Sequence, residues 1–184
     1  MKSKKIVITG APGTGKTSLI HALEKKGYFC LNEISRQITR EAQQNGISQL
    51  FLKDPLLFSE LLLEGRIKQF MMAENSGSGV VFLDRGIPDV TAYMDFIRKE
   101  YPPAFKKAAS EHQYEEVFLL PPWKEIYKPD NERYESFDQA SAIHDFLSKT
   151  YSGLGYQPVE LPFGTIEERI SFILDKLPEE NDGS

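Results

Sequence analysis

Short apolar runs alternate along the chain with longer segments of helical hydrophobic periodicity. The apolar runs are nearly continuous, as in strands that helices cover on both faces. This alternation predicts an α/β fold built on a parallel sheet. Five strands are predicted, at Lys5–Thr9, Tyr28–Leu31, Val80–Asp84, Glu116–Leu120 and Gln157–Leu161.

Recognisable start signals precede several of the helical segments. Asp54 followed by Pro55 is typical of a helix N-cap with proline at the first helical position, and it predicts a helix over Leu56–Met72. Two further segments begin with the spacing of a capping box, in which the first and fourth side chains bond each other's backbone. They are Ser136–Gln139 and Thr165–Glu168.

Size and composition agree with one globular domain. The chain has 184 residues, of which 40% are hydrophobic and 27% charged. We expect a single domain over residues 1–178, followed by a flexible tail over residues 179–184. The 22 Lys and Arg against 27 Asp and Glu give a net charge of −5, which disfavours nucleic acid or anionic lipid as partners.

The chain carries no sign of export or of a membrane span. The first apolar run breaks at Thr9-Gly10, and no apolar stretch approaches the roughly 20 residues that a membrane-spanning helix needs. A single cysteine, Cys30, excludes a disulfide framework and a cysteine-based zinc site. We therefore expect a cytoplasmic protein with no membrane partner.

The residues after the first strand match the phosphate-binding pattern of glycine, four residues, glycine, lysine and serine or threonine. Glycines let the backbone curl so that its N–H groups face phosphate oxygens, and the following helix adds the positive end of its dipole. Lys16 adds a charge for the β- and γ-phosphates, and Thr17 offers a hydroxyl to Mg²⁺. This predicts a site for ATP or GTP with Mg²⁺, formed by Gly10, Ala11, Pro12, Gly13, Thr14, Gly15, Lys16, Thr17 and Ser18.

Asp84 ends the third predicted strand, at the same edge of the sheet as the phosphate loop. It can bind the metal there as a Walker B aspartate does, or it can cap the helix that follows Gly86. The next residue is Arg85, not the second acid with which motor ATPases polarise water. An acid followed by arginine resembles nucleoside and nucleotide kinases, where the pair orients acceptor and phosphoryl group.

Glu33 and Arg36 follow the second strand and are expected at this same edge. Spaced three apart at a helix start, they share a face. Glu33 could accept the proton of an acceptor hydroxyl, while Arg36 could hold the acceptor's anionic or polar part. The structural alternative is an acid that favours a first helical turn and an arginine in a surface salt bridge.

A polar and aromatic segment at about residues 122–137 follows the fourth strand and is predicted to form a short lid over the triphosphate. Arg133 is the candidate that would contact the transferring group. It could instead pair with neighbouring acids on the surface. Trp123 and Tyr127 could stack on a base or pack on the domain surface.

With these motifs in this order, residues 4–177 resemble the NadR/Ttd14-type AAA domain family. That family is similar to the ribosylnicotinamide kinase domain of NadR and to deoxynucleoside kinases, and includes members regarded only as nucleotide-binding proteins. The resemblance implies a three-layer α/β/α P-loop NTPase fold with strand order 2-3-1-4-5, and a nucleotide site at Gly13–Ser18. The single lid arginine and many acids depart from nucleoside monophosphate kinases, which argues against a phosphorylated acceptor.

The leading hypothesis is an ATP-dependent kinase that phosphorylates a hydroxyl of a small nucleoside- or riboside-like acceptor. One alternative is a regulatory switch that binds ATP or GTP, hydrolyses it slowly and has a protein partner. Another is a polynucleotide kinase, which the net charge disfavours. The ligands expected for Mg²⁺ are Thr17 and Asp84, and the candidate catalytic residues are Lys16, Glu33, Asp84, Arg85 and Arg133.

Overall fold

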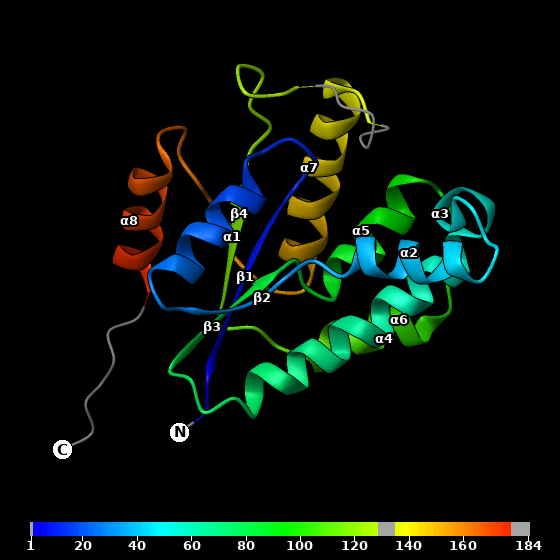
Figure 1. Ribbon diagram of the computed structural model, residues 1–184, viewed down its shortest axis with the longest axis horizontal. Helices are drawn as coiled ribbons and strands as arrows, with labels where there is room; N and C mark the ends of the chain where they lie inside the picture. The colour runs from blue at the N-terminus through cyan, green and yellow to red at the C-terminus, as the bar shows by residue number, and fades with distance from the viewer. Residues whose placement is uncertain (1, 129–134, 178–184) are drawn as a thin grey trace.

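The computed structural model describes residues 2–128 and 135–177. Its strands pair in parallel in the order β2-β3-β1-β4-β5, which confirms the predicted sheet (Figure 1). The strands are β1 (Lys4–Gly10), β2 (Phe29–Leu31), β3 (Val80–Asp84), β4 (Glu116–Leu120) and β5 (Val159–Glu160). β5 is shorter than predicted: Pro158, which lacks an N–H, precedes it.

The helices connect the strands and cover the sheet. Their bounds are α1 (Lys16–Lys25), α2 (Ser35–Gln44), α3 (Leu50–Lys53), α4 (Pro55–Glu74), α5 (Pro88–Phe96), α6 (Pro103–Glu111), α7 (Phe137–Gly153) and α8 (Ile166–Lys176). The predicted cap of α4 is present, because the Asp54 carboxylate accepts the N–H of Leu57 at 3.0 Å. Both predicted capping boxes are also present, at the starts of α7 and α8.

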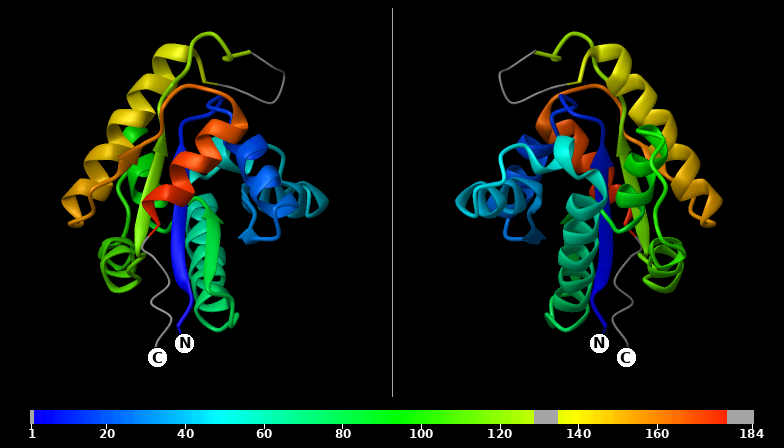
Figure 2. Two further views of the ribbon diagram at one scale, coloured as in Figure 1. Left: turned by 90° about the vertical axis from the view of Figure 1, so that its left-hand side faces the viewer. Right: turned by 90° about the vertical axis from the view of Figure 1, so that its right-hand side faces the viewer.

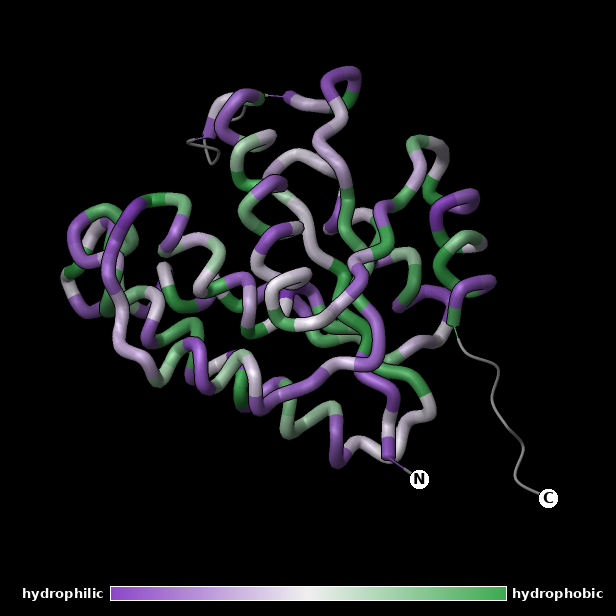
Figure 3. The backbone as a smooth tube through the Cα atoms, turned by 180° about the vertical axis from the view of Figure 1, so that it is seen from behind, coloured by the Kyte–Doolittle hydropathy of each residue, from purple (hydrophilic) through white to green (hydrophobic). Residues whose placement is uncertain are grey.

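Two apolar clusters hold the three layers together. Successive residues of β1 point to opposite faces, so Ile6 packs in one cluster with Leu19 of α1 and Ile173 of α8. Val7 packs in the other cluster with Leu62 of α4. In Figure 1, α1 and α8 accordingly lie on one side of the sheet, and α4, α5 and α7 lie on the other. The hydrophobic colour in Figure 3 is prominent at the strands in the middle of the molecule.

The sheet brings the predicted site to one edge. Ile8 lies beside Asp84 and Gly10 lies beside Leu120, so the carboxyl ends of β1, β3 and β4 are adjacent. Residues 121–128 rise above that edge in both views of Figure 2. Among the helices of the described ranges, none combines the length and apolar character needed to cross a bilayer.

Candidate nucleotide-binding site

The phosphate loop has the backbone that its glycines permit. Gly13 and Gly15 have φ angles of 78° and 84°, in the left-handed region that side chains disfavour. At Gly10 the constraint is space, since a Cβ there would lie 2.9 Å from the carbonyl oxygen of Leu120. Glycine is therefore required at the loop's entry by packing and at its centre by conformation.

Lys16 and Asp84 form a buried ion pair beside this loop. Lys16 is 8% exposed and Asp84 is 4% exposed. The Lys16 Nζ donates a hydrogen bond to Asp84 Oδ1. Burial lowers the pKa of Lys16 and the nearby Arg85 lowers it further, while Asp84 acts in the opposite direction. The alternative role of Asp84 as a helix cap is not observed, because α5 begins at Pro88 with Ile87 as a cap that makes no side-chain bond.

Glu33 makes polar contacts with four other residues. It precedes α2, and its Oε1 accepts the N–H groups of Ile34 and Ser35, each at 3.0 Å. Arg66 lies 3.3 Å from the same oxygen, and the Nε of Arg85 lies 2.5 Å from Oε2. Burial would raise the pKa of Glu33, but the charges of Arg66, Arg85 and Lys16 outweigh it and lower the pKa to about 2. Glu33 is therefore ionised at neutral pH.

Arg85 joins Glu33 to the phosphate loop. Its φ angle is 73°, an uncommon backbone conformation for a residue with a side chain. Its Nη1 donates to the carbonyl of Gly10 at 2.9 Å and lies 3.3 Å from Asp89 Oδ1. Burial opposes a charge on Arg85, but Glu33 and Asp89 together raise its pKa. The side chain is thus held as a cation at the loop's entry.

Sequence reasoning missed two buried charged residues that support this arrangement. Arg66 is 4% exposed and donates both to Glu33 and, at 3.2 Å, to the carbonyl of Gly86. The sequence could have revealed Arg66 by its position, because it lies four residues from both Leu62 and Phe70 and so on the buried face of α4.

The second missed residue is Asp89, which is 4% exposed at the start of α5. Its carboxylate accepts the hydroxyls of Thr9 and Tyr151, the latter at 2.5 Å, and the N–H of Gly86 at 3.0 Å. Burial and the neighbouring Asp89 charge raise the pKa of Tyr151, so this phenol stays a donor. These hydrogen bonds fix the Asp89 carboxylate beside the guanidinium of Arg85.

The remaining predicted residues either lie at the surface or fall outside the described residues. Thr17 and Ser18 are exposed at the start of α1, and Arg36 is exposed on α2. Trp123 packs on the surface aromatic ring of Phe163, with ring centroids 5.1 Å apart. The lid arginine, Arg133, belongs to residues 129–134, which lie outside the described residues.

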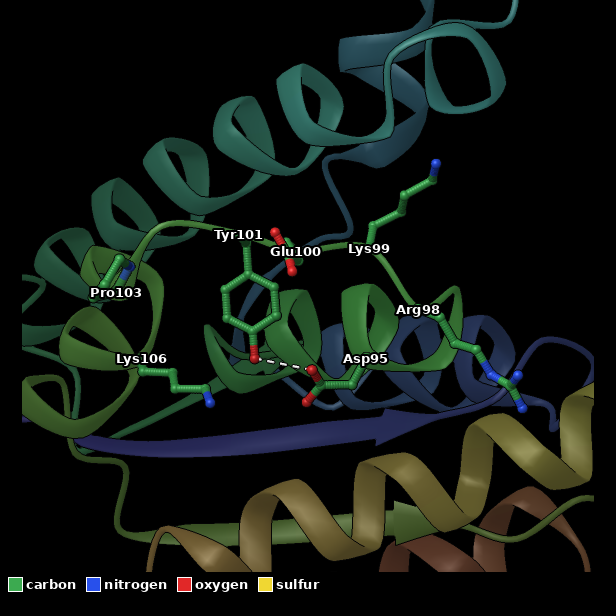
Figure 4. A pocket seen from close by; sticks show the side chains of 7 residues that line it. All are labelled: Asp95, Arg98, Lys99, Glu100, Tyr101, Pro103 and Lys106. Atoms are coloured by element: carbon green, nitrogen blue, oxygen red, sulfur yellow. Dashed lines mark hydrogen bonds between the residues drawn. The ribbon is translucent and has the colours of Figure 1, made fainter.

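A separate surface pocket of about 500 Å³ lies between the end of α5 and the start of α6 (Figure 4). The Tyr101 hydroxyl donates to Asp95 at 3.0 Å within it. Its lining contains none of the predicted site residues, so we assign it no part in nucleotide binding. The lining consists of Asp95, Arg98, Lys99, Glu100, Tyr101, Pro103 and Lys106.

Known proteins resemble this chain in sequence or in fold. A protein of Methanosarcina acetivorans named "Putative adenylate kinase" is 26% identical over 113 residues, which are 60% of this chain and 60% of that protein. The crystal structure of NadR protein in complex with NR has a TM-score of 0.72 and 20% identity, covering 93% of this chain but only 50% of that one. Deoxyadenosine kinase from M. mycoides, with products dCMP and a flexible dCDP bound, has a TM-score of 0.65 and 16% identity, covering 94% of this chain and 97% of that one.

The chain therefore spans about 60% of its curated relative's length and about half of the NadR chain. The structural neighbours, at this identity, show a shared fold and no more. A family model described as AAA domain matches residues 5–169. The chain belongs to this AAA domain family of P-loop proteins.

Proposed function

We propose that the protein is a cytoplasmic, Mg-ATP-dependent kinase that transfers the γ-phosphoryl group to a hydroxyl of a small nucleoside- or riboside-like acceptor. The observation that carries the proposal is the meeting of two charge sets at one edge of the sheet. Lys16 and Asp84 lie at the phosphate loop, and an ionised Glu33 is held beside them by Arg66 and Arg85. Lys16 and Asp84 would bind the phosphates and the metal of the donor, and Glu33 with its two arginines would orient the acceptor.

On the donor side, the loop amides and Lys16 hold the phosphates. The hydroxyl of Thr17 and the carboxylate of Asp84 are hard oxygen ligands of the kind that Mg²⁺ prefers. Bound there, the metal would neutralise charge on the phosphates. GTP remains the alternative donor, because the loop recognises phosphates and not the base.

On the acceptor side, Glu33 orients the attacking hydroxyl by accepting its hydrogen bond. A carboxylate with a pKa of about 2 is a weak base. That weakness is compatible with phosphoryl transfer through a loose transition state, in which bond formation to the attacking oxygen is slight and positioning dominates. The hydroxyl proton leaves late, as the new oxygen–phosphorus bond forms and the bond to ADP breaks, and Glu33 or Asp84 accepts it. Arg85 then steadies the γ-phosphoryl group, together with Arg133 of the proposed lid.

The charges around Glu33 favour an uncharged acceptor. Arg66 is buried and already donates to Glu33 and to the carbonyl of Gly86, so its guanidinium is committed to positioning Glu33 and is not available to an anionic acceptor. The NadR structure holds NR, and the deoxyadenosine kinase structure holds dCMP as a product. These neighbours support a riboside or nucleoside acceptor, whereas the adenylate kinase relative suggests a monophosphate.

The testing experiment measures ADP release from Mg-ATP by the purified protein, with and without a panel of nucleosides that includes nicotinamide riboside. Lys16→Ala serves as the blank, and AMP serves as the phosphorylated comparison. Turnover that depends on a nucleoside would support the proposal. Turnover only with AMP would make the protein a nucleotide kinase, and slow hydrolysis without any acceptor would replace the kinase by a regulatory switch.

A further inference from the structure

Amide N–H groups can face a phosphate only if the loop's carbonyls point away from it and find donors elsewhere. The carbonyl of Gly10 accepts from Arg85 at 2.9 Å. The carbonyl of Ala11 accepts the hydroxyl of Thr14 at 3.0 Å. The carbonyl of Thr14 itself accepts from Nη1 of Arg169 at 3.1 Å. Side chains thus hold outward carbonyls at both the entry and the far end of the loop.

Arg169 reaches Thr14 from α8, across 155 positions of sequence. It is 1% exposed, and among the residues that the structure describes its buried Nε and Nη2 have no hydrogen-bond partner. Burying such donors unpaired costs free energy, and burial lowers the pKa of this guanidinium. The burial of Arg169 is therefore unfavourable for stability, and such local costs are expected at residues that serve function.

The peptide between Thr14 and Gly15 explains what Arg169 can do. In a planar trans peptide the C=O of one residue and the N–H of the next point in opposite directions. Fixing the Thr14 carbonyl on Arg169 therefore fixes the Gly15 N–H toward the opposite side, where the phosphates bind. Gly15 adopts left-handed φ angles freely, so without a fixed carbonyl this peptide could turn over.

We propose that Arg169 is a positioning residue that holds the phosphate loop in its phosphate-binding conformation through the carbonyl of Thr14. The proposal requires only that the loop binds triphosphate, as proposed above, and does not depend on which acceptor is phosphorylated. The guanidinium lies 5.7 Å from the ring of Trp123, the single tryptophan of the chain. The fluorescence of Trp123 is therefore sensitive to changes at the Arg169 guanidinium.

The test compares Arg169→Met and Arg169→Lys with the unaltered protein. Dissociation constants are measured for Mg-ATP and for inorganic tripolyphosphate with Mg²⁺, which has phosphates but no base. Arg169→Met should weaken both about tenfold or more, the fold-change expected for a lost hydrogen bond from a charged donor. Its melting temperature should change little, because removing the unpaired buried donors offsets the loss of the donor to the Thr14 carbonyl.

Two further variants sharpen the test. Arg169→Lys keeps the charge and one donor and should recover part of the affinity for both ligands. Lys176→Met removes an exposed charge from the same helix and should leave both affinities unchanged. The Trp123 emission of unliganded Arg169→Met should differ from that of the unaltered protein, which would place the change at the ring.

Other outcomes would overturn the proposal. A loss of affinity confined to ATP, with tripolyphosphate unaffected, would mean that Arg169 acts on the base end of the nucleotide. A parallel loss of melting temperature and affinity would leave it a purely structural residue. If the unaltered protein binds neither ligand, the phosphate-loop assignment fails together with this proposal. Binding without acceptor-dependent turnover would remove only the kinase.

Discussion

Lys16, at the start of α1, donates a hydrogen bond to the carboxylate of Asp84, at the end of β3, across 68 positions of sequence. Both residues are buried, so the attraction between them is weakly screened. The ammonium and the carboxylate that we assign to phosphate and Mg²⁺ are thus committed to each other. Binding of Mg-ATP must therefore break the Lys16–Asp84 ion pair. Mg²⁺ bound to Asp84 would release Lys16 to contact the phosphates.

We therefore predict that Asp84→Asn reduces the dependence of ATP affinity on Mg²⁺. In EDTA the variant should bind ATP at least as tightly as the unaltered protein, since a repelling carboxylate is removed and Lys16 is freed. With Mg²⁺ it should bind about tenfold or more weakly, by analogy with the loss of a charged partner. Titration calorimetry in both conditions measures this, and an unchanged dependence on Mg²⁺ would contradict the metal assignment.

Lys16→Ala should weaken triphosphate binding without unfolding the protein. It also leaves Asp84 buried without its partner, which costs about 3–5 kcal/mol in other buried pairs. The double variant Lys16→Ala/Asp84→Asn should recover much of that stability but none of the ATP affinity. Denaturant unfolding and ATP titration separate the two effects. Unchanged affinity in Lys16→Ala would defeat the phosphate-loop assignment.

Glu33→Gln should retain ATP affinity and lose phosphoryl transfer, because the amide has a similar shape but no charge with which to orient the acceptor. The matched control is Glu64→Gln, an exposed acid on α4. Acceptor-dependent ADP release and ATP titration are the measurements. Full activity in Glu33→Gln would remove Glu33 from the acceptor site, and a loss in the control would show that the assay reports overall charge.

The low pKa of Glu33 predicts a particular dependence of stability on pH. The pKa is about 2 in the folded protein against a usual 4.5, so the ionised group stabilises the fold above about pH 4.5. This contribution is lost as the pH falls from 4.5 toward 2 and amounts to about 3 kcal/mol. The difference in unfolding free energy between the unaltered protein and Glu33→Gln should therefore shrink in acid. Denaturant titrations across this range check it, and a constant difference would be inconsistent with the assigned charges.

The elements with local signals were predictable from sequence. The strands are continuous apolar runs, and their parallel pairing follows from the alternation with helices. The starts of α4, α7 and α8 were recognisable because capping chemistry involves residues three or four positions apart. The conformation of the phosphate loop also depends on local features, chiefly the φ angles that glycine allows.

The amino-acid sequence by itself determined the five strands, the helices that begin with capping signals and the place of the phosphate loop, because neighbouring residues carry those signals. Only the tertiary structure decided which charges meet there. Arg66 pairs with Glu33 across 33 positions, and Arg169 bonds Thr14 across 155. Hydrophobic periodicity places such residues on a buried face but does not select their partners. Strand register and the packing of α4 and α8 make that selection, since they bring distant side chains within hydrogen-bonding distance.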